Sequence, residues 1–348
     1  MKNKVTIQDI ADALGISRNT VSKAINNSEG LAEATRDKVL QKAVEMGYKQ
    51  FSYVNAAASF SHASAEKAHA APVFQGEIAL FTTIILNQSH FASLMLDKFQ
   101  REISQLGYTI NTHRVTEENL QEMTLPITFR PEPAKAIICF EMFNREYDEM
   151  VCELGLPVLF VDGPAKHGVH NLPADQLYMD NTTGIARFVS DALRKGDRRI
   201  GFIGNPDHCE SFYERYLAFF HTMVMAGVPI EEKFCIQYNH RDEIAEKLRV
   251  LDELPELFVC ANDFVAGDAM RALFSLGKTV PEDVRILGFD DSSESRRSRP
   301  TISSVHIHTQ IMAYEAVHLL ISRIKEPSLD FRTVYTQTDL IERESTRR

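Results

Sequence analysis

The stretch VTIQDIADALGISRNTVSKAIN, residues 5–26, decides how the chain is organised, because its spacing predicts a helix, a tight turn and a second helix. Thr6 and Asp9 stand three positions apart, which is the spacing of a capping box at the start of a helix. Gly15 predicts the end of that helix, and Ser17 is placed to cap the next one. The stretch therefore predicts a helix-turn-helix.

The second of these helices has two chemically different sides. Val21, Ala24 and Ile25 fall on one side and predict a buried face. Polar and basic side chains fall on the other side, namely Arg18, Asn19, Ser22 and Lys23. Arginine and lysine reach guanine O6 and N7 in the DNA major groove, asparagine pairs with adenine, and hydroxyls hold phosphates. The outward side therefore suits DNA, although the pattern alone also fits an ordinary pair of surface helices.

A third helix, predicted over residues 34–46, would complete a small core with the first two. Gly47 predicts the end of this helix, because glycine tolerates the left-handed conformation that often stops one. The apolar side of the helix is formed by Val39, Leu40, Ala43 and Met46. Together the three helices predict a compact module of about fifty residues.

The first fifty residues also resemble the headpiece of the lactose/galactose repressor family, LacI/GalR. The resemblance is carried by TIQDIA (6–11), LGIS (14–17), TVSKAIN (20–26), Thr35-Arg36 and Gly47-Tyr48. It implies that residues 1–50 form a DNA-binding headpiece of a transcriptional regulator, most of whose relatives are repressors, and that double-stranded DNA is a partner. The residues expected to contact DNA are Thr6, Ser17, Arg18, Asn19, Thr20, Ser22, Lys23 and Asn26.

The distribution of charge limits how one headpiece can bind DNA. The whole chain of 348 residues has a net charge of −10, which by itself argues against a nucleic-acid binder. Residues 1–50 hold eight Lys or Arg against six Asp or Glu, a balance of +2. Because phosphate contacts supply much of the affinity for DNA, one weakly basic headpiece should bind feebly. We therefore expect a homodimer that binds a near-palindromic operator.

Composition excludes several other classes of protein. No run of about twenty apolar residues could span a bilayer, and the segment MKNKVTIQDI lacks the apolar core of a secretion signal. We expect a cytoplasmic protein with no membrane partner. The five cysteines are widely spaced and form no CxxC pair, so that neither a disulfide framework nor a zinc finger is indicated. Neither a metal nor a cofactor is expected.

Residues 51–75 are rich in Ala, Ser and His and predict a linker. The family resemblance implies, at this place, a Pro-Asn start and a hinge helix whose leucine enters the minor groove. This chain has Gln50 and Phe51 in place of Pro-Asn, and Ala57 in place of the leucine. The hinge is therefore atypical. Phe51 or Phe60 would be the substitute wedge, and a mobile tether is the alternative.

Residues 76–348 alternate between buried strand patterns and helical patterns. The predicted strands are EIALFTTII (77–85), YTIN (108–111), AKAIICF (134–140), LPVLFV (156–161), RRIGFIG (198–204), ELFVCAN (256–262) and VRILGFD (284–290). Such units form parallel sheets with helices on both faces, and there are too many of them for one ordinary sheet. We predict an α/β body of two doubly wound parallel-sheet lobes with a ligand cleft between them.

The same body resembles the periplasmic-binding-protein-like domain of the LacI/GalR family. The matching segments include MDNTTGIA (179–186), KGDRRIGFIG (195–204), CANDFVAGDAMRAL (260–273) and VRILGFDD (284–291). The resemblance implies an effector-binding and dimerisation domain whose chain crosses between the lobes three times. It would put residues 76–163 and 292–326 in one lobe, and residues 164–291 with the last strand in the other.

Candidate ligand-binding residues stand at the ends of the predicted strands and near one helix start. The resemblance assigns effector contacts to the positions of Asp162, Arg215, Asn262 and Asp290, and an aromatic contact to the place of His90 and Phe91. Carboxylates, an amide and a guanidinium that converge would bind hydroxyl groups, as in a sugar or nucleoside. Considered singly, each residue also fits a helix cap or a surface ion pair, and Phe91 fits a core role. The sequence contains no Trp, so any stacking on a sugar would come from residues such as Phe264 or Tyr213.

Signatures of catalysis are weak. The chain contains no GxSxG elbow, no Walker A loop and no complete GxGxxG motif, and we assign no catalytic residue. His306 and His308, like His167 and His170, lack a third partner for a metal. We therefore expect a regulator and not an enzyme. A solute-binding protein of transport and a sugar- or nucleoside-processing enzyme remain the alternatives.

Overall fold

Three short helices enclose a small apolar core at the N-terminal end of the chain. The computed structural model describes residues 5–25, 31–46, 48, 73–84, 90–238, 240 and 242–347. The helices are α1 (Ile7–Leu14), α2 (Arg18–Ile25) and α3 (Glu33–Glu45). Their shared core contains Ile10, Ala11, Val21, Ala24, Ile25, Val39, Leu40 and Ala43. The predicted headpiece helices and their buried faces are confirmed.

The helix ends follow from the residues that the sequence places there. The Thr6 hydroxyl accepts a hydrogen bond from the Asp9 amide, and the Asp9 carboxylate accepts one from the Thr6 amide, which completes the capping box. Gly15 ends α1 with a φ of 65°, a conformation that costs glycine little. The Ser17 hydroxyl caps α2 by accepting the Thr20 amide at 3.0 Å. These caps set the sharp turn between α1 and α2.

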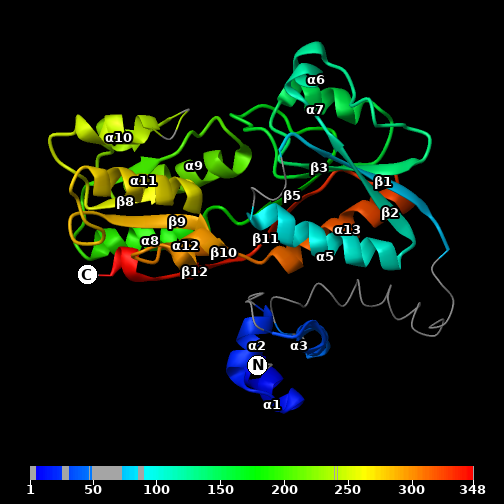
Figure 1. Ribbon diagram of the computed structural model, residues 1–348, viewed down its shortest axis with the longest axis horizontal. Helices are drawn as coiled ribbons and strands as arrows, with labels where there is room; N and C mark the ends of the chain where they lie inside the picture. The colour runs from blue at the N-terminus through cyan, green and yellow to red at the C-terminus, as the bar shows by residue number, and fades with distance from the viewer. Residues whose placement is uncertain are drawn as a thin grey trace.

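The remainder of the described chain forms two lobes, each built on a six-stranded sheet (Figure 1). The first lobe has the order β11-β5-β4-β3-β1-β2, and its strands are β1 (Gly76–Thr82), β2 (Tyr108–Arg114), β3 (Ala134–Phe140), β4 (Val158–Val161), β5 (Asp175–Met179) and β11 (Thr333–Thr336). The second lobe has the order β12-β10-β9-β8-β6-β7, and its strands are β6 (Ile200–Ile203), β7 (Cys235–Ile236), β8 (Leu257–Cys260), β9 (Arg285–Asp290), β10 (Ser303–Ile307) and β12 (Thr338–Ile341). Strand β12 is antiparallel to β10, and the other pairings are parallel. The predicted fold class is confirmed.

Helices cover the faces of both sheets. In the first lobe they are α5 (His90–Gln105), α6 (Glu117–Glu122), α7 (Arg145–Cys152) and α13 (Thr309–Lys325). Figure 1 shows α5 and α13 on one face of the sheet and α6 and α7 on the other. In the second lobe they are α8 (Thr183–Arg194), α9 (Glu210–Met225), α10 (Asp242–Arg249), α11 (Asp263–Ser275) and α12 (Ser293–Arg297). Single turns of 3₁₀ helix span Glu232–Phe234 and Glu344–Thr346.

The assignment of segments to lobes corrects the expectation from sequence. Strand β5 was expected in the second lobe but pairs with β4 and β11 in the first, and β10 was expected in the first lobe but pairs with β9 and β12 in the second. The chain crosses three times as expected, but it does so after β5, after β10 and between β11 and β12. Each expected boundary was therefore displaced by one short strand.

A buried ion cluster explains why β5 belongs to the first lobe. The Asp175 carboxylate at the start of β5 is 1% exposed and accepts hydrogen bonds from the guanidinium of Arg323 on α13, at 3.0 Å for both Nε and Nη2. Arg332, next to β11, donates to the same carboxylate from its backbone amide and its side chain. A buried carboxylate needs such partners. The cluster thus joins three distant parts of the sequence in one lobe.

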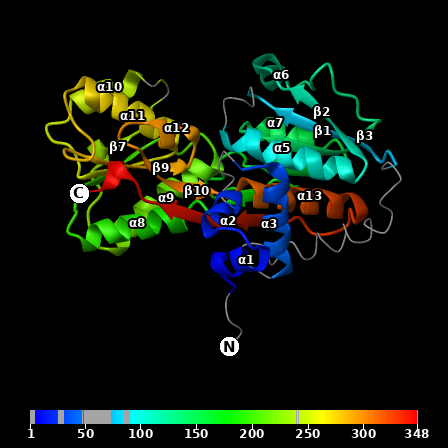
Figure 2. The same ribbon diagram turned by 60° about the horizontal axis from the view of Figure 1, so that its bottom comes forward.

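The headpiece lies beside the region where the two lobes meet (Figure 2). Ile311, in the first turn of α13, packs against the headpiece core. The chain therefore contacts its own headpiece at one of the crossings between the lobes. The predicted linker, with Phe51, Ala57 and Phe60, lies outside the described residues except for residues 73–75. Within the described ranges, none of the helices is both long and apolar enough to cross a membrane.

Candidate functional site

Helix α2 turns its polar side to solvent. Arg18, Asn19 and Lys23 are exposed, whereas Val21 and Ala24 are completely buried in the headpiece core. A single short helix therefore presents a guanidinium, an amide and an ammonium group on one side. These are the groups that read base edges in the major groove.

The hydroxyl residues of the predicted DNA-contacting set lie at the starts of α1 and α2. The Thr6 hydroxyl donates to Asp9, and the Ser17 and Thr20 hydroxyl oxygens are 2.8 Å apart. Their positions place them where helix amides face outward and anions are favoured. Ser22 is half-buried, and Asn26 lies outside the described residues. The geometry of this group suits phosphate contacts.

A cavity of about 220 Å³ lies between the two lobes. The first lobe contributes Ile84, Phe91, Glu141, Phe143, Asp162 and Met179 to its lining. The second lobe contributes His208, Cys209, Ser211, Phe212, Arg215, Asn262, Phe264 and Asp290. Five of the six predicted ligand-binding residues thus come together around one cavity. The sixth, His90, begins α5, and its side chain is outside the described part of the structure.

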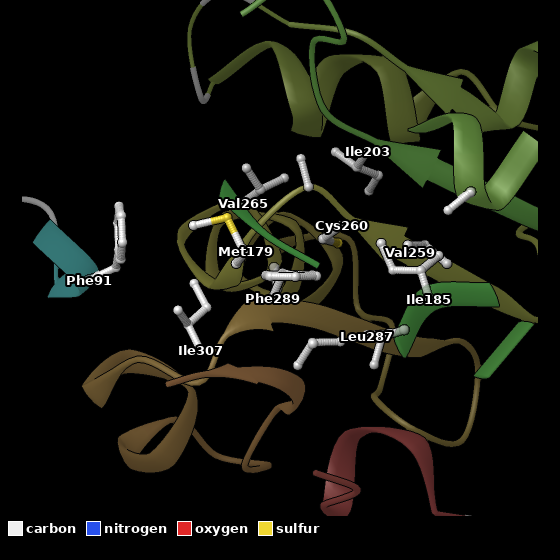
Figure 3. Close-up of a cluster of buried hydrophobic side chains, with 14 of the residues drawn as sticks. Phe91, Met179, Ile185, Ile203, Val259, Cys260, Val265, Leu287, Phe289 and Ile307 are labelled. Carbon is white, nitrogen blue, oxygen red and sulfur yellow. The ribbon is translucent and has the colours of Figure 1, made fainter. Parts of the chain in front are cut away.

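Arg215, on α9, is held in place by the second lobe. Its Nε donates to Asn181 Oδ1 at 3.0 Å, and its Nη1 donates to the Ala261 carbonyl at 2.7 Å. The guanidinium stacks 3.6 Å from the centroid of the Phe289 ring, and Nη1 lies 3.6 Å from Asp290 Oδ1. Figure 3 shows Phe289 in a cluster of buried apolar side chains, to which Phe91 on α5 also belongs. The arginine is therefore a fixed positive charge in the cavity wall.

Asp290, at the end of β9, has an unusual environment. Burial raises the pKa of its carboxyl to about 8, and the carboxylates of Asp263, Glu141 and Asp162 act in the same direction, while Arg215 opposes them. Near neutral pH this carboxyl is therefore largely protonated and can both donate and accept a hydrogen bond. The adjacent Asp291 points elsewhere, to His306 Nδ1 at 2.9 Å and to Arg343.

Acidic residues with left-handed backbone surround the cavity. Glu141, Asp162 and Asp290 have φ values of 50°, 59° and 103°, each at the carboxyl end of a strand. Such conformations cost about 1–3 kcal/mol each and concentrate at functional sites. Asp162 Oδ1 accepts the amides of Gly163 at 2.9 Å and Ser211 at 3.3 Å. All three residues line the cavity.

Asn262 is both a helix cap and a residue of the cavity lining, the two roles that its position in the sequence allowed. Its Oδ1 accepts the Val265 amide at 2.9 Å and caps α11, and the same side chain lines the cavity. Phe91 is likewise both 8% exposed in the core and part of the lining. Of the two residues suggested for stacking, Phe264 lines the cavity, whereas Tyr213 packs on His167 with ring centroids 4.6 Å apart.

The sequence reasoning missed several residues of the lining. Glu141 and Phe143 follow β3 just as Asp162 follows β4, so the strand-end rule that found Asp162 would have found them too. His208 packs between Phe143 and Phe212, with ring centroids 5.0 and 5.1 Å apart. Burial lowers the pKa of His208. This ring comes from a loop, and no local pattern marks it.

The two lobes touch directly beside the cavity. The Glu210 amide at the start of α9 donates to the Gly163 carbonyl at 2.9 Å, across the boundary between the lobes. Tyr335 on β11 donates its hydroxyl proton to Glu214 on α9 at 2.6 Å. The first turns of α9 therefore bind the first lobe, while the same helix carries Arg215 into the cavity.

A larger open groove of about 670 Å³ lies elsewhere, within the second lobe. Arg194, Arg198 and Arg199 line it. Arg194 pairs with Asp191, and Arg198 donates to the Leu193 and Asp197 carbonyls. Because this groove does not touch the first lobe, a ligand there would not bridge the two lobes. The cavity between the lobes is the better candidate site.

Comparison with known families places both parts of the chain. Residues 6–50 match the family described as bacterial regulatory proteins, lacI family, and residues 189–346 match the periplasmic binding protein-like domain. The two matches occur in the order that the headpiece and the two-lobed body require. The chain belongs to the LacI family. As a LacI-family protein it is a DNA-binding transcriptional regulator and not an enzyme, which decides against both alternatives considered from the sequence.

Related LacI-family proteins align over nearly the full chain. The probable repressor ExuR of Bacillus subtilis is 24% identical over 99% of both chains, and the regulator CelR of Thermobifida fusca is 25% identical over 99% of both. The repressor PurR of Pasteurella multocida is 26% identical over 98% of both. These similarities are those of distant members of one family.

Solved structures share the LacI-family fold. A complex of the regulator CelR with cellobiose has a TM-score of 0.66 and 22% identity, and covers 98% of this chain and 100% of its own. The lac repressor dimer bound to operator and an anti-inducer has a TM-score of 0.64 and 17% identity over 99% of both chains. A LacI-type structure from Alkaliphilus metalliredigens with D-xylulofuranose has a TM-score of 0.62 and 20% identity, and covers 79% of this chain and 100% of its own.

Proposed function

We propose that this regulator is a homodimer whose two headpieces bind a near-palindromic operator, under the control of a sugar held between the lobes. The observation that carries the proposal is the cavity, in which carboxyls, an amide and a guanidinium converge beside aromatic rings. Such a set of donors, acceptors and apolar faces recognises hydroxyl-rich ligands. Phe91, Asp162, Arg215, Asn262 and Asp290, with His90 at its edge, would contact the effector.

Residues 1–50 would read the operator. In this proposal Arg18, Asn19 and Lys23 contact base edges, and the hydroxyl groups of Thr6, Ser17, Thr20 and Ser22, with Asn26, contact the backbone. The headpiece balance of +2 supports pairing of two headpieces, because each one offers few phosphate contacts. A dimer with two-fold symmetry requires two half-sites of opposite direction.

Control by the effector would follow from linkage. A ligand that bridges the lobes favours the arrangement in which Glu210 and Gly163 are in contact. It changes operator affinity only by its differential affinity for the two arrangements of the lobes. Residues 76–348 would thus serve as effector-binding and dimerisation domain, and residues 51–75 as the linker that separates it from the headpiece.

Related structures support a sugar as the effector, and the size of the cavity supports a single ring. Two related solved structures hold cellobiose and D-xylulofuranose, which are both carbohydrates. The cavity of about 220 Å³ has the space of about seven waters, at roughly 30 Å³ per water, which favours one ring over two linked rings. Of the relatives named above, PurR bears the name repressor and ExuR is a probable repressor, so repression is the proposed sign. The work of the protein on DNA supports a cytoplasmic location.

A gel-shift experiment tests this proposal. The full chain is mixed with duplex DNA from the neighbouring promoter region, intact or with one half-site scrambled, and the series is repeated with a panel of monosaccharides. We expect binding that needs both half-sites and that one sugar of the panel alters. Full affinity for a single half-site would contradict the dimer, and indifference to every duplex at low salt would contradict the function.

A further inference from the structure

The cavity between the lobes has an uneven charge. Glu141, Asp162 and Asp290 line it, against the single guanidinium of Arg215. Burial lowers the pKa of His208, so this ring is neutral at pH 7. Even with Asp290 protonated, two carboxylates face one guanidinium. Among the described residues of the lining, negative charge is therefore in excess.

The guanidinium of Arg215 is already bound to the protein. Its Nε and Nη1 donate to Asn181 and to the Ala261 carbonyl, and one of its faces stacks on Phe289 at 3.6 Å. Asp290 lies 3.6 Å from Nη1. An arginine that neutralises an incoming anion normally offers a bidentate fork. Here Nε and Nη1 of that fork are already hydrogen-bonded within the second lobe.

The two carboxylates of the first lobe stand at the ends of neighbouring strands. Glu141 and Asp162 directly follow β3 and β4, and both have left-handed φ angles. The Glu141 carbonyl accepts the Thr83 hydroxyl at 3.1 Å, and Asp162 Oδ1 accepts two backbone amides. The first lobe therefore contributes two acidic side chains to the lining, and that of Asp162 is held by backbone amides.

We propose that this cavity selects its effector by charge: it accepts a single-ring sugar that is neutral or carries an amine, it rejects sugar acids, and Glu141 sets this selectivity. The inference rests on the proposed function and specifies the ligand class of the same site. Carboxylates accept hydrogen bonds from hydroxyl pairs and from ammonium groups. A third carboxylate in the ligand would meet Glu141 and Asp162 in a partly desolvated site, and like charges placed together weaken binding by at least about tenfold.

Matched sugars test the inference by isothermal titration calorimetry on the full chain. For each of the gluco, galacto and manno rings, the neutral sugar, its 2-amino derivative and its uronic acid are compared at pH 7. The variants are Glu141→Gln and, as a second test of the same charge, Asp162→Asn. Glu146→Gln is the control, because Glu146 is exposed on α7 and does not line the cavity. Thermal unfolding of each variant checks that it is folded.

We expect the neutral or amino member of one ring to bind at least about tenfold more tightly than its acid. Glu141→Gln should reduce that ratio severalfold, and Glu146→Gln should leave it unchanged. An acid that binds as tightly as its neutral partner overturns the charge selectivity while the sugar effector stands. An unchanged ratio in both Glu141→Gln and Asp162→Asn overturns the role of these residues. If none of the nine sugars binds, the sugar effector and its charge selectivity are both wrong.

Discussion

The guanidinium of Arg215 stacks on the Phe289 ring at 3.6 Å while its Nη1 donates to the Ala261 carbonyl. One residue thus joins α9, which touches the first lobe, to the strand ends of the second lobe. Arg215 lines the cavity between the lobes and lies far in sequence from the headpiece. The effector role proposed for it should therefore be separable by mutation from DNA binding.

Arg215→Ala should retain operator binding and lose the response to the effector. The substitution leaves Asn181 and the Ala261 carbonyl without their donor, so we also expect the free energy of unfolding to fall by about 3 kcal/mol. Gel shifts with and without effector, together with urea unfolding, measure the two effects. Full retention of the effector response in Arg215→Ala would show that the cavity has been assigned to the wrong role.

Substitutions on α2 should act on DNA alone. Asn19→Ala and Lys23→Ala are each expected to cost about 1–3 kcal/mol of operator binding and to relax base preference at the position contacted. Both side chains are exposed, so the fold should be unaffected. Binding to a library of single-base operator variants measures the preference. Gln41→Ala, at an exposed position of α3, is the control, and an equal loss in that variant would contradict base reading by α2.

Asp148 predicts a dependence of stability on pH. This residue belongs to α7 and is completely buried, and neither of its carboxyl oxygens has a hydrogen-bond partner within the described structure. Burial raises the pKa of Asp148 to about 8. The folded state therefore keeps a proton that the unfolded state releases near pH 4, so that stability falls as the pH rises from 4 to 8. From pH 6 to pH 9 this one group should remove about 2–3 kcal/mol.

Asp148→Asn should abolish that part of the pH dependence. Urea unfolding of the two proteins at pH 6 and pH 9 measures it, and the variant should gain stability relative to the parent as the pH rises. Glu146→Gln, on the exposed side of the same helix, should track the parent at both pH values. A parallel pH dependence in the parent and Asp148→Asn would mean that Asp148 is already ionised in the folded protein.

The contact of Ile311 with the headpiece core should couple the lobes to the headpiece. Ile311→Asp places a carboxylate against the apolar core of the headpiece, so the contact at the crossing should be lost. We expect the effector to bind as before but to change operator affinity less than in the parent. Paired calorimetry and gel shifts measure the two affinities, and Ile311→Val is the conservative control. An undiminished effector response in Ile311→Asp would assign the coupling to another contact.

Local features of the sequence predicted the headpiece almost completely. The capping pair Thr6 and Asp9, the stop at Gly15 and the cap at Ser17 each act within four residues, so their spacing alone defines the helices. The strand-end rule was equally successful for Asp162 and Asp290, because parallel strands carry their carboxyl ends to one edge of a sheet. The headpiece helices could be predicted because their ends depend on local chemistry. The positions of Asp162 and Asp290 could be predicted because they depend on a general property of parallel sheets.

Contacts between distant segments escaped prediction. The assignment of β5 to the first lobe depends on the Asp175 carboxylate meeting Arg323, which lies 148 positions further along the chain. No periodicity encodes that pairing. His208 entered the cavity for a similar reason, since it belongs to a loop whose position is set by Phe143 and Phe212 from different lobes. Glu141 could have been found, because it stands at a strand end like Asp162.

The order in which the chain forms its two sheets has a consequence for the newly made protein. Strands β11 and β12, between Thr333 and Ile341, complete the edges of both sheets, whereas the headpiece helices end at Glu45. During translation the headpiece can therefore fold long before the sheet of either lobe is complete. A polypeptide released early by the ribosome would carry a folded headpiece without a complete two-lobed body, and as a single headpiece it would bind an operator only weakly.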